Sequence, residues 1–267
     1  MQASVKTGVS RLFQAIPLEQ AVDENSPVVE AWIARSTQLT TLVDRRLARD
    51  SREFYSSIAN LMGASTPSFA DPPPADIEAI HTSLAVTGVV GLRKRLEKIQ
   101  QAPAREVEDP FIQRQQQLLA AGIDSLRRDA QKTSGDAAGG AASRHAGDGA
   151  RNQIQDTARL DRRAQGWIRI TSMRPCYFCA MLASRGPVYK ESSFEMSDIM
   201  FTGEGRHKVH DSCACSMRPI YTRNTDERPT ANLTFEGMWR SLSDELGHSP
   251  TLEEWRSHYE KQVKPRV

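Results

Sequence analysis

Residues 175–179, Pro-Cys-Tyr-Phe-Cys, and residues 210–215, His-Asp-Ser-Cys-Ala-Cys, decide how the second half of this chain folds. All four cysteines of the 267-residue chain lie in these two segments. A C-x2-C turn can present two sulfur atoms to one metal ion, and a second segment can supply the remaining ligands. The spacing therefore predicts a metal site that closes the loop between the two segments.

Zinc is the metal that these ligands favour, because it prefers four tetrahedral thiolate or imidazole ligands. Either Cys215 or His210 can complete a site with the three other cysteines, whereas His207 fits less well because it precedes the second segment. Four protein ligands leave no open position for a catalytic water, so the predicted site is structural. The predicted ligands are Cys176, Cys179, His210, Cys213 and Cys215.

Three other uses of these thiols are open. Two disulfides would need an oxidising compartment, and residues 1–16 lack the continuous apolar segment of a signal peptide. A thioredoxin-like C-x-x-C would need a long helix after the motif, and only the preceding strand is predicted. Unrelated free thiols would not be expected to gather in two pairs. Zinc therefore explains the spacing best.

Motifs of known enzymes are missing from the sequence. It contains no G-x-S-x-G, no H-E-x-x-H, no P-loop and no G-x-G-x-x-G. Cys176 or Cys179 with His210 can form a thiol nucleophile and its base, but the same residues fit a zinc site. A zinc deaminase would need H-x-E before P-C-x-x-C, and none precedes Pro175. No catalytic residue is predicted.

The first half of the chain is predicted to be helical, because its apolar residues recur at helical spacing. Ser26-Pro27 and Asp109-Pro110 each place a capping residue before a proline, as at a helix N-terminus. The predicted helices cover residues 1–16, 27–61, 76–100 and 110–132, and the proline-rich residues 63–74 are predicted to connect the second helix to the third.

Glycine becomes frequent between Ser134 and Ala150, where five glycines fall within sixteen residues. Glycine at this density opposes a regular helix, because each glycine loses more conformational freedom on folding than any other residue. Residues 134–150 are therefore predicted to be a flexible linker and a domain boundary. His145 lies in this segment and is expected to be solvated.

Short strands are predicted at residues 167–171, 188–190 and 217–221, after a basic helix at residues 151–165. Two further helices, at residues 235–246 and 251–262, form a terminal hairpin that can also be a docking surface. Thr251 and Glu254 predict a capping box at the start of the second helix. The fold class is therefore mainly α with a small α+β module. Its parts are an elongated helical N-terminal bundle (1–133), the glycine-rich linker (134–150), a zinc-stapled module (151–222) and a helical tail (223–267).

The charge of the chain does not predict a dedicated nucleic-acid binder. It has 35 basic and 33 acidic residues, a formal net charge of +2. No run of eighteen apolar residues occurs, so no membrane span is predicted. A weaker hypothesis is that cations of the zinc module contact phosphates, namely Arg151, Arg159, Arg162, Arg163, Arg206 and Lys208.

The run from Gln165 to Gly186, the segment His210–Cys215 and Arg218-Pro219 resemble one known module. It is the C-terminal module of the Mu F-like minor capsid, or head morphogenesis, proteins of tailed phages that infect actinobacteria. Some members of that group are labelled capsid maturation proteases. The resemblance is weaker in the helical N-terminal half and adds little after Tyr221.

The resemblance implies a phage head protein that is made in the host cytoplasm and packaged near the portal vertex or in the head interior. Its expected partners are the portal, the major capsid protein and packaged DNA. A structural minor capsid protein is the first hypothesis for function. A capsid maturation protease and a nucleic-acid-binding zinc module are the two alternatives.

Overall fold

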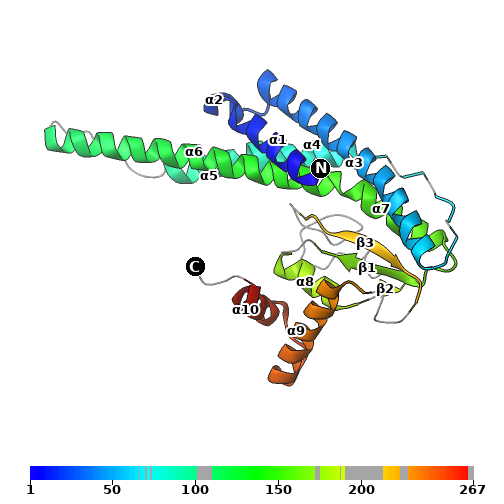
Figure 1. The fold of residues 1–267 in the computed structure, drawn as a ribbon. Helices are drawn as coiled ribbons and strands as arrows, with labels where there is room; N and C mark the ends of the chain where they lie inside the picture. Colours follow the sequence, from blue (N-terminus) through cyan, green and yellow to red (C-terminus); the bar gives the residue numbers. More distant parts are fainter. Residues whose placement is uncertain are drawn as a thin grey trace. The chain divides into compact units, whose positions relative to one another are not determined.

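The computed structural model describes residues 1–65, 67–69, 71–72, 74–100, 110–171, 175–186, 188–189, 213–222 and 228–263 (Figure 1). Most of these residues are helical, and three short strands form one sheet, which confirms the mainly α class with a small α+β module. None of the described helices has an apolar stretch long enough to span a lipid bilayer.

The elements follow the chain in this order. The helices before the sheet are α1 (Gln2–Gln14), α2 (Leu18–Ala21), α3 (Pro27–Leu61), α4 (Ile77–Leu84), the π-helix η1 (Ala85–Val90), α5 (Gly91–Gln100), α6 (Pro110–Ala146) and α7 (Asp148–Leu160). The remaining elements are β1 (Gly166–Ile170), α8 (Tyr177–Ser184), β2 (Val188–Tyr189), β3 (Ser216–Ile220), α9 (Thr230–Leu246) and α10 (Leu252–Val263).

The chain divides into two compact units. Unit 1 contains Met1–Val43, Ala75–Ala146 and a short segment that ends at Cys213, and unit 2 contains the rest of the chain. One boundary falls inside α3, after Val43, so this helix contributes residues to both units. The predicted domains 1–133 and 223–267 differ from this division, because the second half of α3 and the terminal helices belong to unit 2.

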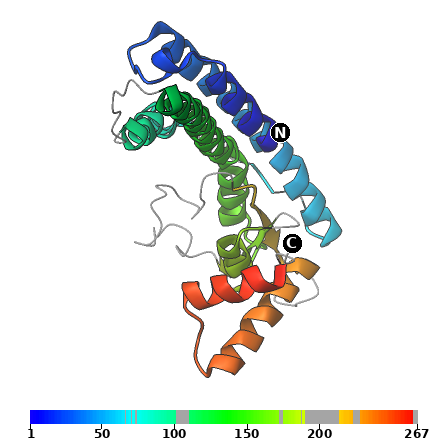
Figure 2. The same cartoon turned by 90° about the vertical axis from the view of Figure 1, so that its left-hand side faces the viewer.

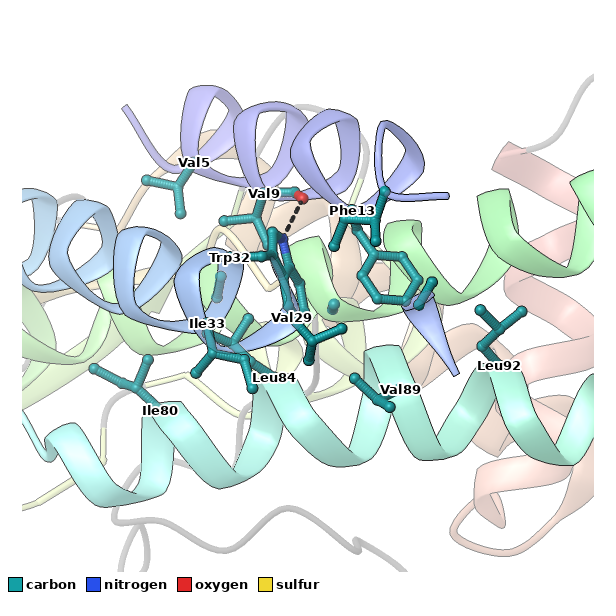
Figure 3. Packing of buried hydrophobic residues seen from close by; sticks show 14 of the residues in the cluster. Val5, Val9, Phe13, Val29, Trp32, Ile33, Ile80, Leu84, Val89 and Leu92 are labelled. Atoms are coloured by element: carbon teal, nitrogen blue, oxygen red, sulfur yellow. Dashed lines mark hydrogen bonds between the residues drawn. The ribbon is translucent and has the colours of Figure 1, made fainter. Parts of the chain in front are cut away.

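Unit 1 is built around one apolar core that α1, α3, α4, η1 and α6 share (Figure 3). Trp32 lies in it, 4% exposed, and its indole Nε1 donates to the carbonyl of Val9 at 3.2 Å. The ring of Phe13 lies 4.7 Å from that of Trp32, centroid to centroid. Gly88 in η1 leaves room for the indole, since a Cβ there would lie 2.8 Å from Trp32 Cη2. The core therefore requires a glycine at this position.

The predicted flexible linker is wrong for residues 134–146, which form the last part of α6. Glycines 135 and 139 face α1, which lies beside α6 in Figure 1. A Cβ on Gly135 would lie 3.1 Å from the carbonyl oxygen of Ser10, and one on Gly139 would overlap the carbonyl oxygen of Lys6. The glycines thus allow two helix backbones to approach closely, and packing offsets their low helix propensity.

Polar contacts strengthen the same helix pair. The hydroxyl of Ser10 donates to Asp136 Oδ1 at 2.6 Å, and Lys132 Nζ lies 3.0 Å from Asp136 Oδ2. The Ser10 hydrogen bond, followed by the bond from Lys132, lowers the pKa of Asp136. His145 is half-buried rather than solvated, and its Nε2 lies 3.0 Å from the hydroxyl of Ser83. The C-terminal part of α6 is therefore an ordered element of unit 1.

Unit 2 contains the sheet, whose strand order is β2-β1-β3 with both pairings antiparallel. The register of the longer pair runs from Gly166 opposite Ile220 to Ile170 opposite Ser216. The three strands confirm the predicted ones to within a residue or two. Asn232 on α9 is buried, and its amide donates at 2.9 Å to the carbonyls of Arg169 and Ala183. It thereby ties α9 to both β1 and α8.

The N-terminus of α7 is capped by a side chain from α3. The backbone N–H of Gly149 donates to Oδ1 of the buried Asp44 at 2.5 Å. A carboxylate at a helix N-terminus accepts from an N–H group that has no partner within the helix. A Cβ on Gly149 would lie 2.7 Å from both Asp44 O and Asp44 Oδ1. Gly149 is thus a packing residue, not part of a flexible linker.

The predicted terminal hairpin is confirmed as α9 and α10, the orange and red helices of Figure 2. The predicted capping box is also present: Thr251 N donates to Glu254 Oε2 at 2.8 Å, and Glu254 N donates to Thr251 Oγ1 at 3.3 Å. Phe235, Trp255 and Tyr259 pack with α8 in one apolar cluster. The hairpin is therefore part of unit 2 and not a separate tail.

Candidate metal centre

The first cysteine segment starts a helix. Cys176 is the N-cap residue of α8, with an extended backbone, and its Sγ accepts the backbone N–H of Cys179 at 3.3 Å. Cys179 lies in the first turn of α8 and is buried, whereas Cys176 is half-buried. The C-x2-C spacing thus forms a turn in which a sulfur takes the place of the usual oxygen cap.

Three buried cysteines come together between the two segments. The sulfurs of Cys179, Cys213 and Cys215 all lie within 4.8 Å of one another, and none of the four cysteines is in a disulfide. Zinc–sulfur bonds of about 2.3 Å at tetrahedral angles would place the sulfurs about 3.8 Å apart. The three thiols therefore fit a metal ion after small side-chain adjustments.

The other predicted ligands are placed differently. Cys176 does not belong to this group of three, although it is three residues before Cys179. His210 and His207 lie outside the described residues. Cys215, which the sequence left as an alternative to His210, lies with Cys179 and Cys213. The structure thus brings together three of the five predicted ligands.

The second cysteine segment is held by a buried arginine of α7. Arg151 is 2% exposed, its Nε donates to the carbonyl of Cys215 at 3.1 Å, and its Nη1 lies 2.8 Å from Asp148 Oδ1. The hypothesis that Arg151 contacts nucleic-acid phosphates is therefore wrong, because its guanidinium points into the protein.

The remaining predicted phosphate contacts lie at the end of α7 or beyond it. Arg159 pairs with Asp156 at 3.8 Å. Arg162 and Arg163 are exposed, and Arg163 Nε lies 3.6 Å from Asp161. Arg206 and Lys208 lie outside the described residues. A role of these cations in phosphate binding stays a prediction.

Helix α10 contacts the first cysteine segment through two hydrogen bonds. Trp255 Nε1 donates to the carbonyl of Tyr177 at 2.7 Å, and the Tyr259 hydroxyl donates to the carbonyl of Pro175 at 2.7 Å. Burial, with the nearby thiols of Cys176 and then Cys179 adding to it, raises the pKa of Tyr259 to about 12. The phenol is therefore protonated at neutral pH and can donate.

A buried carboxylate joins three elements of unit 2. Asp161 Oδ2 lies 3.4 Å from the hydroxyl of Tyr55 on α3 and 2.9 Å from that of Tyr221, which follows β3. Burial is the main cause that raises the pKa of both phenols. Sequence reasoning missed this cluster, because its members are far apart in the chain and match no motif.

A serine–histidine pair lies in unit 1, where the hydroxyl of Ser83 meets His145 Nε2. Arg144 Nη2 lies 3.2 Å from the same ring nitrogen. Arg144 Nη2 also lies 3.5 Å from the hydroxyl of Ser83, so the same guanidinium contacts both members of the pair. The pair therefore fits a structural contact better than a nucleophile and its base.

Comparison with known proteins gives one match. The model of the VG15 protein family matches residues 87–241, more than half of the 267-residue chain. The match includes all four cysteines and Arg151, and it ends before α10. No curated protein and no solved structure matches the chain. The chain therefore belongs to the VG15 protein family, a family of phage proteins.

Proposed function

We propose that this chain is a structural minor capsid protein of a tailed phage, of the Mu F-like head-morphogenesis type. Membership of a phage protein family supports the proposal at the coarse level. One further observation supports the more specific assignment to the Mu F-like type. Cys179 lies in the first segment on which the resemblance depends, Cys213 and Cys215 lie in the second, and the three thiols meet in one buried group.

The proposal includes a structural zinc ion in the C-terminal module. Cys179, Cys213 and Cys215 would provide three thiolates, and Cys176 or His210 would provide the fourth ligand. Zinc bound here would supply folding energy, of the order of 10 kcal/mol at neutral pH in small zinc modules. Soft thiolates in a buried cluster favour zinc over magnesium or calcium, which prefer oxygen ligands.

Its proposed partners are the portal and the major capsid protein, and its proposed location is the portal vertex or the head interior. We assign the docking role to unit 1, because α9 and α10 of unit 2 pack on α8 and are already used inside the module. Packaged DNA is a further proposed partner, through exposed cations such as Arg162.

The proposal can be tested on the phage that encodes the chain. Mass spectrometry of purified, DNA-filled virions should detect this protein at low copy number, and chemical cross-linking should join lysines of unit 1, such as Lys6 and Lys132, to portal or major capsid subunits. Phage lacking the protein should assemble defective heads. Normal infectious virions without the protein would overturn the proposal.

The maturation-protease alternative makes a different prediction for the same virions. A thiol protease would use Cys176 or Cys179 as its nucleophile, so either Cys176→Ser or Cys179→Ser would leave capsid subunits unprocessed even when metal is bound. A structural zinc site predicts instead that processing, where it occurs, continues in any variant that still folds. Mass spectrometry of the capsid subunits in the mutant phage distinguishes the two.

A further inference from the structure

Both cysteine segments are fixed by hydrogen bonds from helices that contain no metal ligand. On one side, Arg151 of α7 donates to the carbonyl of Cys215. On the other side, Trp255 and Tyr259 of α10 donate to the carbonyls of Tyr177 and Pro175, the two residues that flank Cys176. Each of these three hydrogen bonds ends on a backbone carbonyl oxygen, so none of the three uses a sulfur.

The three donors are buried and well formed. Arg151 is 2% exposed, Trp255 is fully buried, and Tyr259 is 4% exposed. A buried carbonyl that loses its donor keeps a desolvation cost that no hydrogen bond compensates. The backbone of each cysteine segment is therefore held where its carbonyl keeps this donor. The sulfurs of the segment are held in position together with the backbone.

We infer that Arg151, Trp255 and Tyr259 are positioning residues of the metal centre, which hold the two cysteine segments at the separation that one ion requires. This inference rests on the proposed zinc site. It also assigns the terminal helix a role: α10 lies beyond residue 241, where the family match ends, and yet it holds the first cysteine segment.

The positive charge of Arg151 would have a second effect on the proposed zinc site. Three thiolates and one imidazole leave a zinc complex with one net negative charge, and four thiolates leave it with two. A buried guanidinium beside the carbonyl of Cys215 offsets part of that charge where water cannot. Lysine at the same position would keep the charge but lose the planar donor that binds Cys215 and Asp148 together.

The test compares matched pairs of variants in the full chain, purified under reducing conditions and titrated with Co2+ and Zn2+. Tyr259→Phe removes one hydroxyl, and Tyr221→Phe removes the hydroxyl of a half-buried tyrosine that bonds Asp161 instead. Arg151→Lys is paired with Arg159→Lys on the same helix, where the arginine pairs with Asp156. Metal affinity is measured by competition with a chelator, and geometry by the absorption spectrum of bound Co2+ at saturation.

Tyr259→Phe and Arg151→Lys should each weaken metal binding by about 10- to 100-fold, the usual effect of losing an outer hydrogen bond at a metal site. Their Co2+ spectra at saturation should also differ from that of the wild type, which a general loss of stability would not cause once metal has restored the fold. Tyr221→Phe and Arg159→Lys should keep the wild-type spectrum and affinity to within a few-fold.

Two results would overturn the inference, and they can be told apart. If the wild-type chain binds Co2+ and Zn2+ tightly and all four variants bind alike, the zinc site stands and the positioning role is wrong. If the wild-type chain binds neither ion, the zinc site is wrong and the positioning role falls with it. Trp255→Phe serves as a second test of the α10 side if Tyr259→Phe fails to fold.

Discussion

Replacing Gly139 by alanine should destabilise unit 1, although alanine is the better helix former. The Cβ of alanine would overlap the carbonyl oxygen of Lys6 and lie 3.1 Å from its carbonyl carbon and 3.4 Å from its Cα. These are backbone atoms of a helix, so no side-chain rotation can relieve the overlap. Helix α1 would have to move away from α6 and out of the core.

The magnitude follows from two opposing effects. Alanine in place of glycine inside a helix gains about 1 kcal/mol of free energy of unfolding. Forcing extra volume into a packed interface costs about 1–3 kcal/mol, and a rigid backbone neighbour favours the upper end. The expected net loss is therefore about 2 kcal/mol. Gly122 on the same helix is a control, because a Cβ there would meet no atom within 4 Å, so Gly122→Ala should gain about 1 kcal/mol.

Urea unfolding followed by far-UV circular dichroism measures both variants, and hydrogen exchange of peptides from residues 134–146 assigns the change to unit 1. The two variants should differ by about 3 kcal/mol in opposite directions from the wild type. If Gly139→Ala is as stabilising as Gly122→Ala, then α1 does not pack on this part of α6, and a flexible segment at residues 134–150 would again be the better interpretation.

Three further outcomes are expected. A strong chelator, or Cys213→Ser, should abolish hydrogen-exchange protection of β1 and β3 and leave α1 unchanged, since the metal would supply of the order of 10 kcal/mol. The hydrogen bond from Ser10 lowers the pKa of Asp136, so its ionised form favours folding. This contribution to stability is fully present above the ordinary carboxyl pKa near 4, and it is lost as the pH falls through the lower pKa of the folded state. Asp136→Asn should therefore make the unfolding of unit 1 less sensitive to acid. Gly149→Ala should lower the free energy of unfolding of unit 2 by about 1–3 kcal/mol, because it disrupts the carboxylate cap of α7. Gly237→Ala is the control and should not lower it, because a Cβ there would meet no atom within 4 Å.

The sequence predicted the features that depend on neighbouring residues. The Ser26-Pro27 start of α3, the capping box at Thr251 and the three strands are all local patterns, and all are present. The grouping of cysteines was also predictable, because two ligand pairs separated by a loop indicate a metal site whatever the rest of the fold.

Features that depend on distant partners were missed. Glycines 135 and 139 indicate flexibility in isolation, and only the approach of α1 makes them packing residues. Helical spacing alone could not show which side chains near the end of α3 are buried, where Leu61 is 79% exposed and Tyr55 is fully buried, because the two ends of α3 belong to different units. The basic pattern of α7 likewise could not show that Arg151 turns inward to Cys215.

The strand order has a consequence for how the protein forms during synthesis. The central strand β1 is made first, and both of its neighbours come later in the chain, with β3 separated from it by the long segment between Ile170 and Ser216. Such non-local pairing is slow, because the intervening loop must close before any contact compensates for its lost entropy. An ion that joins Cys179 to Cys213 and Cys215 would close nearly the same loop. The supply of metal during synthesis would then set how quickly newly made chains complete this sheet.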